Sequence, residues 1–177
     1  MRVIGGEFRS RVLKSLPGLD VRPTPDRMRE SLFSILAPRI GDAVFADLYA
    51  GTGAVGIEAL SRGARKALFV EQNQAAVELI RVNLKSLGIE NRSRVWQGRT
   101  ASVIPKMEPV DIAFLDPPYP LEVEYERALM ALCDEPPSLV IAQHCSRFAL
   151  QESYGVFKRS RLVKQGDNTL SFFTLQA

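Results

Sequence analysis

The sequence has few of the residues from which metal sites and cysteine- or histidine-based active sites are built. Its 177 residues include two cysteines and one histidine. Cys133 and Cys145 show neither metal-ligand spacing nor a neighbouring base, so we interpret both as small core residues. His144 is expected to have a structural rather than a catalytic role. The sequence therefore predicts no metal site and no cysteine nucleophile.

Long apolar runs are also absent. No segment approaches the roughly 18 consecutive apolar residues that a membrane span needs, and the N-terminus, MRVIGGEFRS, lacks the apolar middle of a signal peptide. We therefore expect a cytoplasmic protein with no membrane partner. Internal repeats and low-complexity segments are missing too. At this length, with 46% hydrophobic residues, the chain can form one globular core but hardly two.

Positive charge is concentrated at the N-terminal end. The formal net charge is only +3, but residues 1–30 carry seven basic and four acidic side chains, whereas the rest of the chain carries 16 of each sign. The seven basic residues are Arg2, Arg9, Arg11, Lys14, Arg22, Arg27 and Arg29. Such a concentration is typical of a surface that meets a polyanion, and a merely solvated basic edge is the alternative.

The first residues read as an extension of the main domain. Residues 3–16 contain two short β-prone runs around Gly5 and Gly6, which predict a small hairpin or an extended arm. We therefore divide the chain into a basic arm, 1–22, which would contact a polyanion, and a main domain, 23–177.

A helix is expected after the arm. Thr24 followed by Pro25 predicts a helix start, because threonine can cap a helix and proline suits its first position. Apolar residues then recur at helical spacing between residues 28 and 36, so one face packs on the domain. Arg27 and Arg29 lie off that stripe, where we expect them to be free to face a partner.

From residue 43 onward, strand and helix patterns alternate. The predicted strands are 43–49, 67–71, 94–97, 110–116 and 138–143, and the predicted helices are 55–61, 77–87 and 122–132. Alternation of this kind predicts right-handed crossovers and a parallel sheet covered on both faces. Two final β-prone runs, 156–164 and 169–175, are joined by a turn sequence and predict an antiparallel hairpin. The fold class is therefore α/β: a mainly parallel seven-stranded sheet that ends in an antiparallel hairpin, like that of the Rossmann-like class I methyltransferases.

A glycine loop follows the first of these strands. Gly51-Thr-Gly-Ala-Val-Gly56 matches the G-x-G-x-x-G pattern, and Glu71 follows 20 residues after Gly51. Glycines let the backbone approach a ligand, and a carboxylate at the end of the second strand can accept hydrogen bonds from ribose hydroxyls. Such a loop and carboxylate can bind either NAD or S-adenosylmethionine, so the motif alone does not distinguish between the two cofactors.

Three features favour S-adenosylmethionine. Asp47 stands just before the loop, where a carboxylate suits a cofactor with an amino group better than one with a pyrophosphate. No segment resembles the separate substrate domain of a dehydrogenase. The third feature is the sequence Asp116-Pro-Pro-Tyr119.

The residues Asp116, Pro117, Pro118 and Tyr119 are predicted to form the catalytic loop. They follow an apolar strand, at the edge where open α/β sheets bind ligands. The Asp116 carboxylate and the Pro117 carbonyl can accept hydrogen bonds from an amine and favour the charge that builds on its nitrogen. Two prolines remove N–H donors, and Tyr119 offers a ring on which a base can stack. This pattern predicts methylation of an amine, and a plain proline turn is the alternative.

Several motifs together resemble one known family, the bacterial 16S rRNA guanine-N2-methyltransferases of the RsmD type. They are Arg2-Val-Ile-Gly-Gly6, Arg22-Pro-Thr-Pro-Asp-Arg-Met-Arg-Glu-Ser-Leu-Phe33, Asp47-Leu-Tyr-Ala-Gly-Thr-Gly-Ala-Val-Gly56, Glu58-Ala-Leu-Ser-Arg-Gly-Ala64 and Asp116-Pro-Pro-Tyr119. The resemblance covers essentially the whole chain. It implies methyl transfer from S-adenosylmethionine to one guanine of small-subunit rRNA.

The expected contacts follow from these motifs. We expect cofactor contacts from Asp47, Tyr49, Ala50, Gly51, Thr52, Gly53, Glu71, Gln72, Gly98 and Arg99. We expect RNA contacts from Arg2, Arg9, Arg11, Arg22, Thr24, Arg27 and Arg29. The chain departs from the family at two positions: Arg99 stands near where an acidic or amide residue usually meets adenine, and Gln143 replaces a glutamate. A glutamine can still bind a base but supplies no charge.

The leading hypothesis is therefore a monomeric methyltransferase whose arm and arginines grip rRNA of the small ribosomal subunit while a guanine swings out onto Tyr119. Methylation of adenine N6 or of a protein glutamine is one alternative. A non-catalytic RNA-binding assembly factor is the other.

Overall fold

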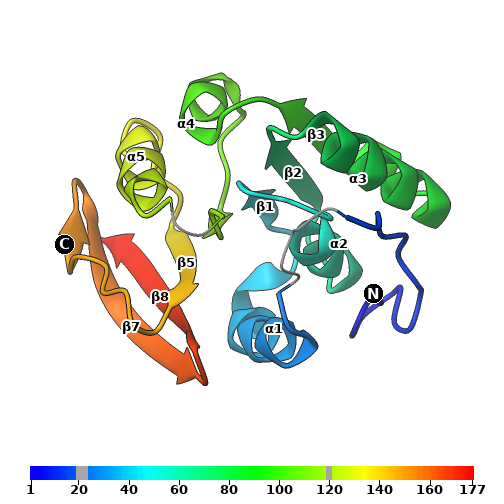
Figure 1. Cartoon of the computed structure of the whole chain (residues 1–177). Helices are drawn as coiled ribbons and strands as arrows, with labels where there is room; N and C mark the ends of the chain where they lie inside the picture. Colours follow the sequence, from blue (N-terminus) through cyan, green and yellow to red (C-terminus); the bar gives the residue numbers. More distant parts are fainter. Residues whose placement is uncertain (19–23, 119–120) are drawn as a thin grey trace.

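The computed structural model describes residues 1–18, 24–118 and 121–177, which form a three-layer α/β domain around one mixed sheet (Figure 1). The strands are β1 Val44–Asp47, β2 Lys66–Glu71, β3 Ser93–Gln97, β4 Ile112–Leu115, β5 Leu139–Cys145, β6 Ser153–Tyr154, β7 Phe157–Gln165 and β8 Asn168–Leu175. The helices are α1 Asp26–Ile40, α2 Ala54–Ser61, α3 Gln74–Leu87, α4 Thr100–Val103 and α5 Val123–Ala131, with short 3₁₀ turns at Glu90–Arg92 and Ile104–Lys106.

The strand order places the end of β1 beside that of β4. The order is β3-β2-β1-β4-β5-β8-β7-β6, in which β1 to β5 are parallel and β8 runs antiparallel to β5. The predicted fold class is confirmed. The sheet has one strand more than expected, the two-residue β6, which is too short to give a periodic signal in the sequence. The four-residue helix α4 was missed for the same reason.

Alternating apolar side chains along the strands build one core on each face of the sheet. Phe45 and Phe114 face α1, while Ala46 and Leu115 face α5. The helix α3 is defined by local signals: Asn73 accepts a hydrogen bond from the N–H of Ala76 at its start, and apolar residues repeat along it. Among the helices of the described residues, none has the length and apolar character needed to cross a bilayer.

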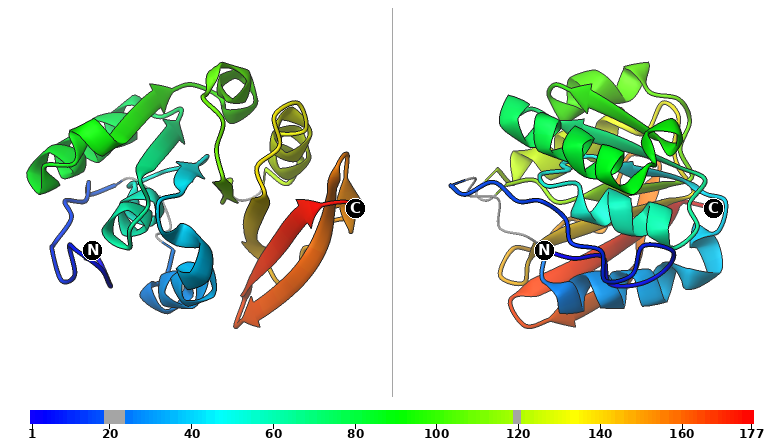
Figure 2. Two further views of the ribbon diagram at one scale, coloured as in Figure 1. Left: turned by 180° about the vertical axis from the view of Figure 1, so that it is seen from behind. Right: turned by 90° about the vertical axis from the view of Figure 1, so that its right-hand side faces the viewer.

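The N-terminal arm packs on the helices of one face (Figure 2). Antiparallel backbone pairing joins Arg2 to Val12, so the expected hairpin forms as a single bridge rather than as two strands. Val3 and Leu13 are buried in a core cluster with residues of α2 and α3. The boundary that we drew after residue 22 falls in 19–23, outside the described residues.

Candidate active site

The carboxylates of the predicted cofactor and catalytic motifs converge at one edge of the sheet. Asp47, Glu71 and Asp116 lie at or just after the carboxyl ends of the parallel strands β1, β2 and β4. Ligands of open α/β sheets bind at this edge, next to the point where the strand order reverses. The structure therefore brings the residues of three separate motifs into one site.

The glycine loop joins β1 to α2 in a tight turn. Gly53 has a φ of 79°, in the left-handed region that strains other residues, and its N–H donates to the carbonyl of Ala50 at 2.7 Å. Gly56 lies against the ring of Phe69 on β2, where a Cβ would have no room. The loop thus needs glycine both for its turn and for the close packing of α2 on the sheet.

Asp47 is the buried acidic group of the site, with only 1% of its surface exposed. Its Oδ2 accepts a hydrogen bond from the N–H of Gly56 at 3.0 Å. Burial raises the pKa of Asp47 from 3.8 to about 7; the hydrogen bond opposes this rise, and the carboxylates of Asp116 and Glu71 add to it. A cation placed beside Asp47 would favour its charged form, so the environment suits the amino group of S-adenosylmethionine.

Glu71 is oriented by the backbone around it. Its Oε2 accepts the N–H of Gly51 at 2.8 Å, and its Oε1 accepts the N–H of Asn73 at 2.9 Å. The N–H of Gly98 donates to the main-chain carbonyl of Glu71 at 3.0 Å. Each carboxylate oxygen keeps a second lone pair, and the residue is half-buried, so Glu71 can still accept hydrogen bonds from ribose hydroxyls. These free acceptor positions suit the ribose of S-adenosylmethionine.

The remaining predicted cofactor residues differ in exposure. Ala50 is buried, Thr52 is half-buried, and Gln72 and Arg99 are exposed. The hydroxyl of Tyr49 lies 3.2 Å from both the main-chain oxygen and the carboxylate of Glu124 in α5. Tyr49 therefore contacts α5 through its hydroxyl and precedes the glycine loop in the chain.

In the catalytic loop, Asp116 is half-buried, Pro117 is buried and Pro118 is exposed. Tyr119 lies outside the described residues. The hydroxyl of Thr24 lies 3.4 Å from the Oδ2 of Asp116, across 92 positions of sequence. Our prediction that Thr24 caps α1 is wrong: the helix begins at Asp26 without a side-chain cap, because the Thr24 hydroxyl turns to Asp116 instead.

Gln143 is a polar residue beside this loop that was not among the predicted site residues. β4 and β5 pair Leu115 with Ala142, so Gln143 follows on the strand next to Asp116. It is 5% exposed, and its Oε1 accepts no hydrogen bond from the described residues. Its main-chain carbonyl accepts the hydroxyl of Tyr125 at 2.6 Å. Burying an amide oxygen without a hydrogen-bond donor costs free energy, so Gln143 is a candidate ligand contact. In the sequence, the signal for this role was a polar residue at the end of the predicted apolar strand 138–143.

His144 is held within the sheet, as expected for a structural residue. Its Nε2 lies 2.8 Å from the hydroxyl of Ser171, and its Nδ1 lies 3.0 Å from the carbonyl of Cys145. Burial lowers its pKa, which favours the neutral ring.

The predicted RNA-binding arginines are mostly on the surface. Arg2, Arg9, Arg11 and Arg27 are exposed, and none of them forms an ion pair with an acidic residue of the described parts of the chain. Arg22 lies outside the described residues. The exposed arginines belong to the arm and to the first turn of α1, which are adjacent because Arg29 of α1 donates to the carbonyl of Arg2.

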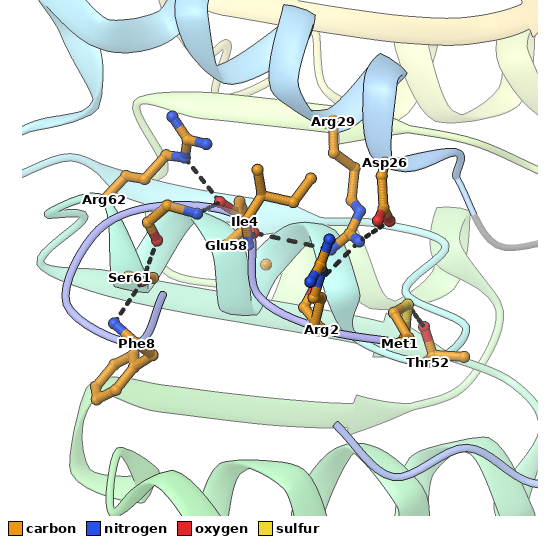
Figure 3. Close-up of polar contacts among 12 residues, drawn as sticks. Met1, Arg2, Ile4, Phe8, Asp26, Arg29, Thr52, Glu58, Ser61 and Arg62 are labelled. Carbon is orange, nitrogen blue, oxygen red and sulfur yellow. Dashed lines mark hydrogen bonds and ion pairs between the residues drawn. The ribbon is translucent and has the colours of Figure 1, made fainter. Parts of the chain in front are cut away.

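Arg29 is the exception, and the expectation that it faces a partner is wrong. Its side chain is completely buried beneath the arm (Figure 3). It donates to Asp26 at 2.6 Å and to the carbonyl of Arg2 at 3.1 Å, and it lies 3.7 Å from Glu58. The physical reason is that α1 packs against both the sheet and the arm, so its buried face is wider than the stripe of a surface helix.

Glu58 of α2 is the anchor of the arm, a role that sequence reasoning missed. Its two carboxylate oxygens accept the N–H groups of Ile4 and Gly5 at 2.9 and 2.8 Å, and Arg62 donates to it at 2.8 Å (Figure 3). Asn83 of α3 binds the arm farther along, pairing with both main-chain groups of Lys14. In the sequence, the available signals for this anchoring were the polar residues Glu58 and Asn83, each placed among apolar residues of its helix.

Comparison with known proteins agrees with this geometry. Residues 1–174 match the family model described as conserved hypothetical protein 95. The chain is 34% identical over 175 residues to a putative rRNA methyltransferase, YlbH, of Bacillus subtilis, with 94% of each chain covered. It is 41% identical over 119 residues to ribosomal RNA small subunit methyltransferase D of Escherichia coli, which covers 67% of this chain and 60% of that protein.

Solved structures agree as well. The structure of the putative methyltransferase yhhF from Escherichia coli aligns with a TM-score of 0.87 at 31% identity and covers 100% of this chain and 98% of that one. Similarity therefore extends from the arm to the C-terminal hairpin. The chain belongs to the conserved hypothetical protein 95 family, which is the family of the RsmD-type methyltransferases that its motifs resemble.

Proposed function

We propose that this protein methylates the exocyclic N2 of a guanine in 16S rRNA of the small ribosomal subunit. The observation that carries the proposal is the placement of the Asp116 loop beside Asp47 and Glu71 at one edge of the sheet. Methyltransferases of this class use S-adenosylmethionine, which supplies an electrophilic methyl group when bound. Relatives named as rRNA small subunit methyltransferases support the choice of substrate.

The chain's own residues supply orientation and acceptors rather than a nucleophile. The Asp116 carboxylate and the Pro117 carbonyl would bind the two N–H groups of the amine and stabilise the positive charge that develops on its nitrogen. The hydroxyl of Thr24 helps to orient that carboxylate. We therefore reassign Thr24 from RNA binding to positioning of Asp116. Holding nitrogen and methyl group in line provides the rest of the acceleration.

Gln143 supports a guanine substrate. In guanine, the N1–H donor is adjacent to N2, and O6 is the next acceptor along the same edge of the base. An amine held by Asp116 would bring N1–H toward the neighbouring strand, where Gln143 has a buried Oε1 without a donor. The amide nitrogen of the same side chain could donate to O6. A neutral glutamine thus matches this edge of guanine without a charge.

Exposed arginines of the arm and of α1 account for binding of the RNA backbone. Arg2, Arg9, Arg11 and Arg27 are exposed and available to phosphates, and Arg22 belongs to the same proposal, as does stacking of the base on Tyr119. Contacts with phosphates orient RNA without reading its sequence.

Methylation of unmodified small-subunit particles tests the function. With labelled S-adenosylmethionine, we expect one methyl group per particle, and nuclease digestion with mass mapping should identify N2-methylguanosine in 16S rRNA. N6-methyladenosine or methylglutamine would overturn the choice of amine. Absence of any transfer with particles that bind the protein would favour an assembly factor.

Cofactor affinity should depend on pH through Asp47. Because its pKa in the free protein is about 7, the carboxylate is mostly protonated at pH 6 and mostly ionised at pH 8. A cofactor amino group prefers the ionised form, so S-adenosylhomocysteine should bind about tenfold more weakly at pH 6 than at pH 8, with a proton released on binding. Calorimetry in two buffers of different ionisation enthalpy measures both effects. The Asp47→Asn variant should bind weakly at every pH; equal affinity of the wild type at both pH values would contradict the assignment.

A further inference from the structure

The C-terminal hairpin carries basic side chains that the proposed function does not use. Strand β7 has four basic residues and no acidic one. Arg159 forms an ion pair with Glu152 at 4.0 Å, so its charge is partly neutralised. The others, together with one residue of the loop after β5, are exposed and form no ion pair with any acidic residue that the structure describes. We define the hairpin patch as Arg147, Lys158, Arg161 and Lys164. Arg161 pairs with Phe172 and Lys164 pairs with Thr169, so these two side chains leave the sheet on opposite faces and border the same outer edge of β7.

The turn of the hairpin lies at the active-site edge of the sheet. β5 and β8 are antiparallel and pair Cys145 with Asn168, so the turn between β7 and β8 stands at the carboxyl end of β5. The loop that carries Arg147 is tied to this turn, because the N–H of Ser146 donates to the carbonyl of Asp167 at 2.8 Å. The patch therefore extends from β7 to the edge where Asp116 lies.

The hairpin and the arm flank the catalytic loop on opposite sides. In the strand order, β4 lies between β1 and β5; the arm binds α2 and α3, which cover β1 to β3, and the hairpin continues the sheet beyond β5. Figure 2 shows the arm and the hairpin on opposite flanks of the molecule in its left view, with part of the arm and the turn of the hairpin toward the same side in its right view. An RNA strand that contacts the arm and reaches Asp116 would continue toward the hairpin.

The alternative explanation is protection of an exposed strand. β6 pairs only with Phe157 and Lys158, so most of β7 is a sheet edge, and basic residues on an edge discourage pairing with other chains. That explanation does not extend to Arg147, which lies in a loop. Arg161 stacks over the ring of Phe172 at 5.9 Å, which holds its planar guanidinium on the surface. All charged residues of β7 are basic, and Asp167 of the turn is the one acidic residue between Phe157 and Leu175; such an excess of positive charge suits a polyanion.

We propose that the hairpin patch is a second RNA-binding surface, which contacts the sugar-phosphate backbone on the side of the active site opposite to the N-terminal arm. The proposal rests on RNA being the substrate. Because phosphate contacts carry no sequence information, the patch contributes affinity and orientation and leaves the choice of base to the catalytic pocket.

A double charge reversal, Arg161→Glu with Lys164→Glu, tests the proposal in the full chain. Both positions stay charged, so edge protection is kept while attraction to phosphate becomes repulsion. We expect binding to unmodified small-subunit particles to weaken about tenfold or more, with the slope of log Kd against log salt reduced by about 1 to 2. The KM for particles should rise by the same factor, whereas kcat and the affinity for S-adenosylhomocysteine should not change.

The matched control is Arg39→Glu with Lys106→Glu. Both residues are exposed and form no ion pair among the described residues, and they lie in the segments that lead into β1 and β4, at the opposite edge of the sheet. This control should bind particles like the wild type. Equal weakening of both double variants, or wild-type affinity of the hairpin variant, would overturn the proposal. Failure of the wild type to methylate rRNA in the same reactions would instead contradict the proposed function.

Discussion

Replacing Asp116 by Asn should lower the rate of methyl transfer about 100- to 1000-fold. The carboxylate is the charged acceptor for the amine, and an amide of the same shape cannot stabilise the positive charge on nitrogen. A loss of this size corresponds to about 3 to 4 kcal/mol of transition-state stabilisation. Single-turnover transfer to small-subunit particles measures it, and binding of the particles should be retained.

Cofactor binding provides the control for this variant. Asp116 raises the pKa of Asp47, so its neutralisation should lower that pKa and leave S-adenosylhomocysteine affinity at pH 8 unchanged or slightly higher. Loss of cofactor affinity would show a folding or binding defect rather than a catalytic one. Normal turnover in Asp116→Asn would remove the Asp116 carboxylate from catalysis.

Replacing Arg29 by Ala should destabilise the protein by about 3 kcal/mol. Arg29 is completely buried and is one of the two cations beside the buried Glu58, the other being Arg62. Its removal leaves a cavity and reduces the electrostatic compensation of that carboxylate. The carbonyl of Arg2 also loses its donor, which should loosen the arm. Equilibrium denaturation measures the free energy of unfolding, and protease sensitivity of the arm should increase.

Arg27→Ala is the matched control, two positions away on the same helix. Its side chain is exposed, so stability should change by no more than about 0.5 kcal/mol while RNA affinity falls in a salt-dependent manner. Replacement of Arg29 should thus change the free energy of unfolding, and replacement of Arg27 should change RNA affinity. An Arg29→Ala variant with wild-type stability and weaker RNA binding would restore our original expectation for Arg29.

Much of the site could be anticipated because its chemistry is encoded in short, local motifs. The glycine loop, Asp47 and the Asp116 loop each follow a strand of apolar residues, and parallel strands bring their carboxyl ends to one edge. Thr24 was assigned differently because its contact with Asp116 spans 92 residues, which no local pattern reports. Gln143 was recognised as unusual, but only the pairing of β4 with β5 places it beside Asp116.

By itself, the sequence determined the order of strands and helices, the class of fold and the residue types of the catalytic loop, because the periodicity of apolar residues and turn chemistry are local properties. Only the tertiary structure decided which polar groups are buried and which charges share a surface. The arm covers Arg29 and turns an expected RNA contact into a structural one. Lys158, Arg161 and Lys164 already share one strand, and folding brings the loop of Arg147 to the turn of that hairpin. Burial and electrostatic potential depend on contacts between distant segments, so charge counted along the chain does not predict them.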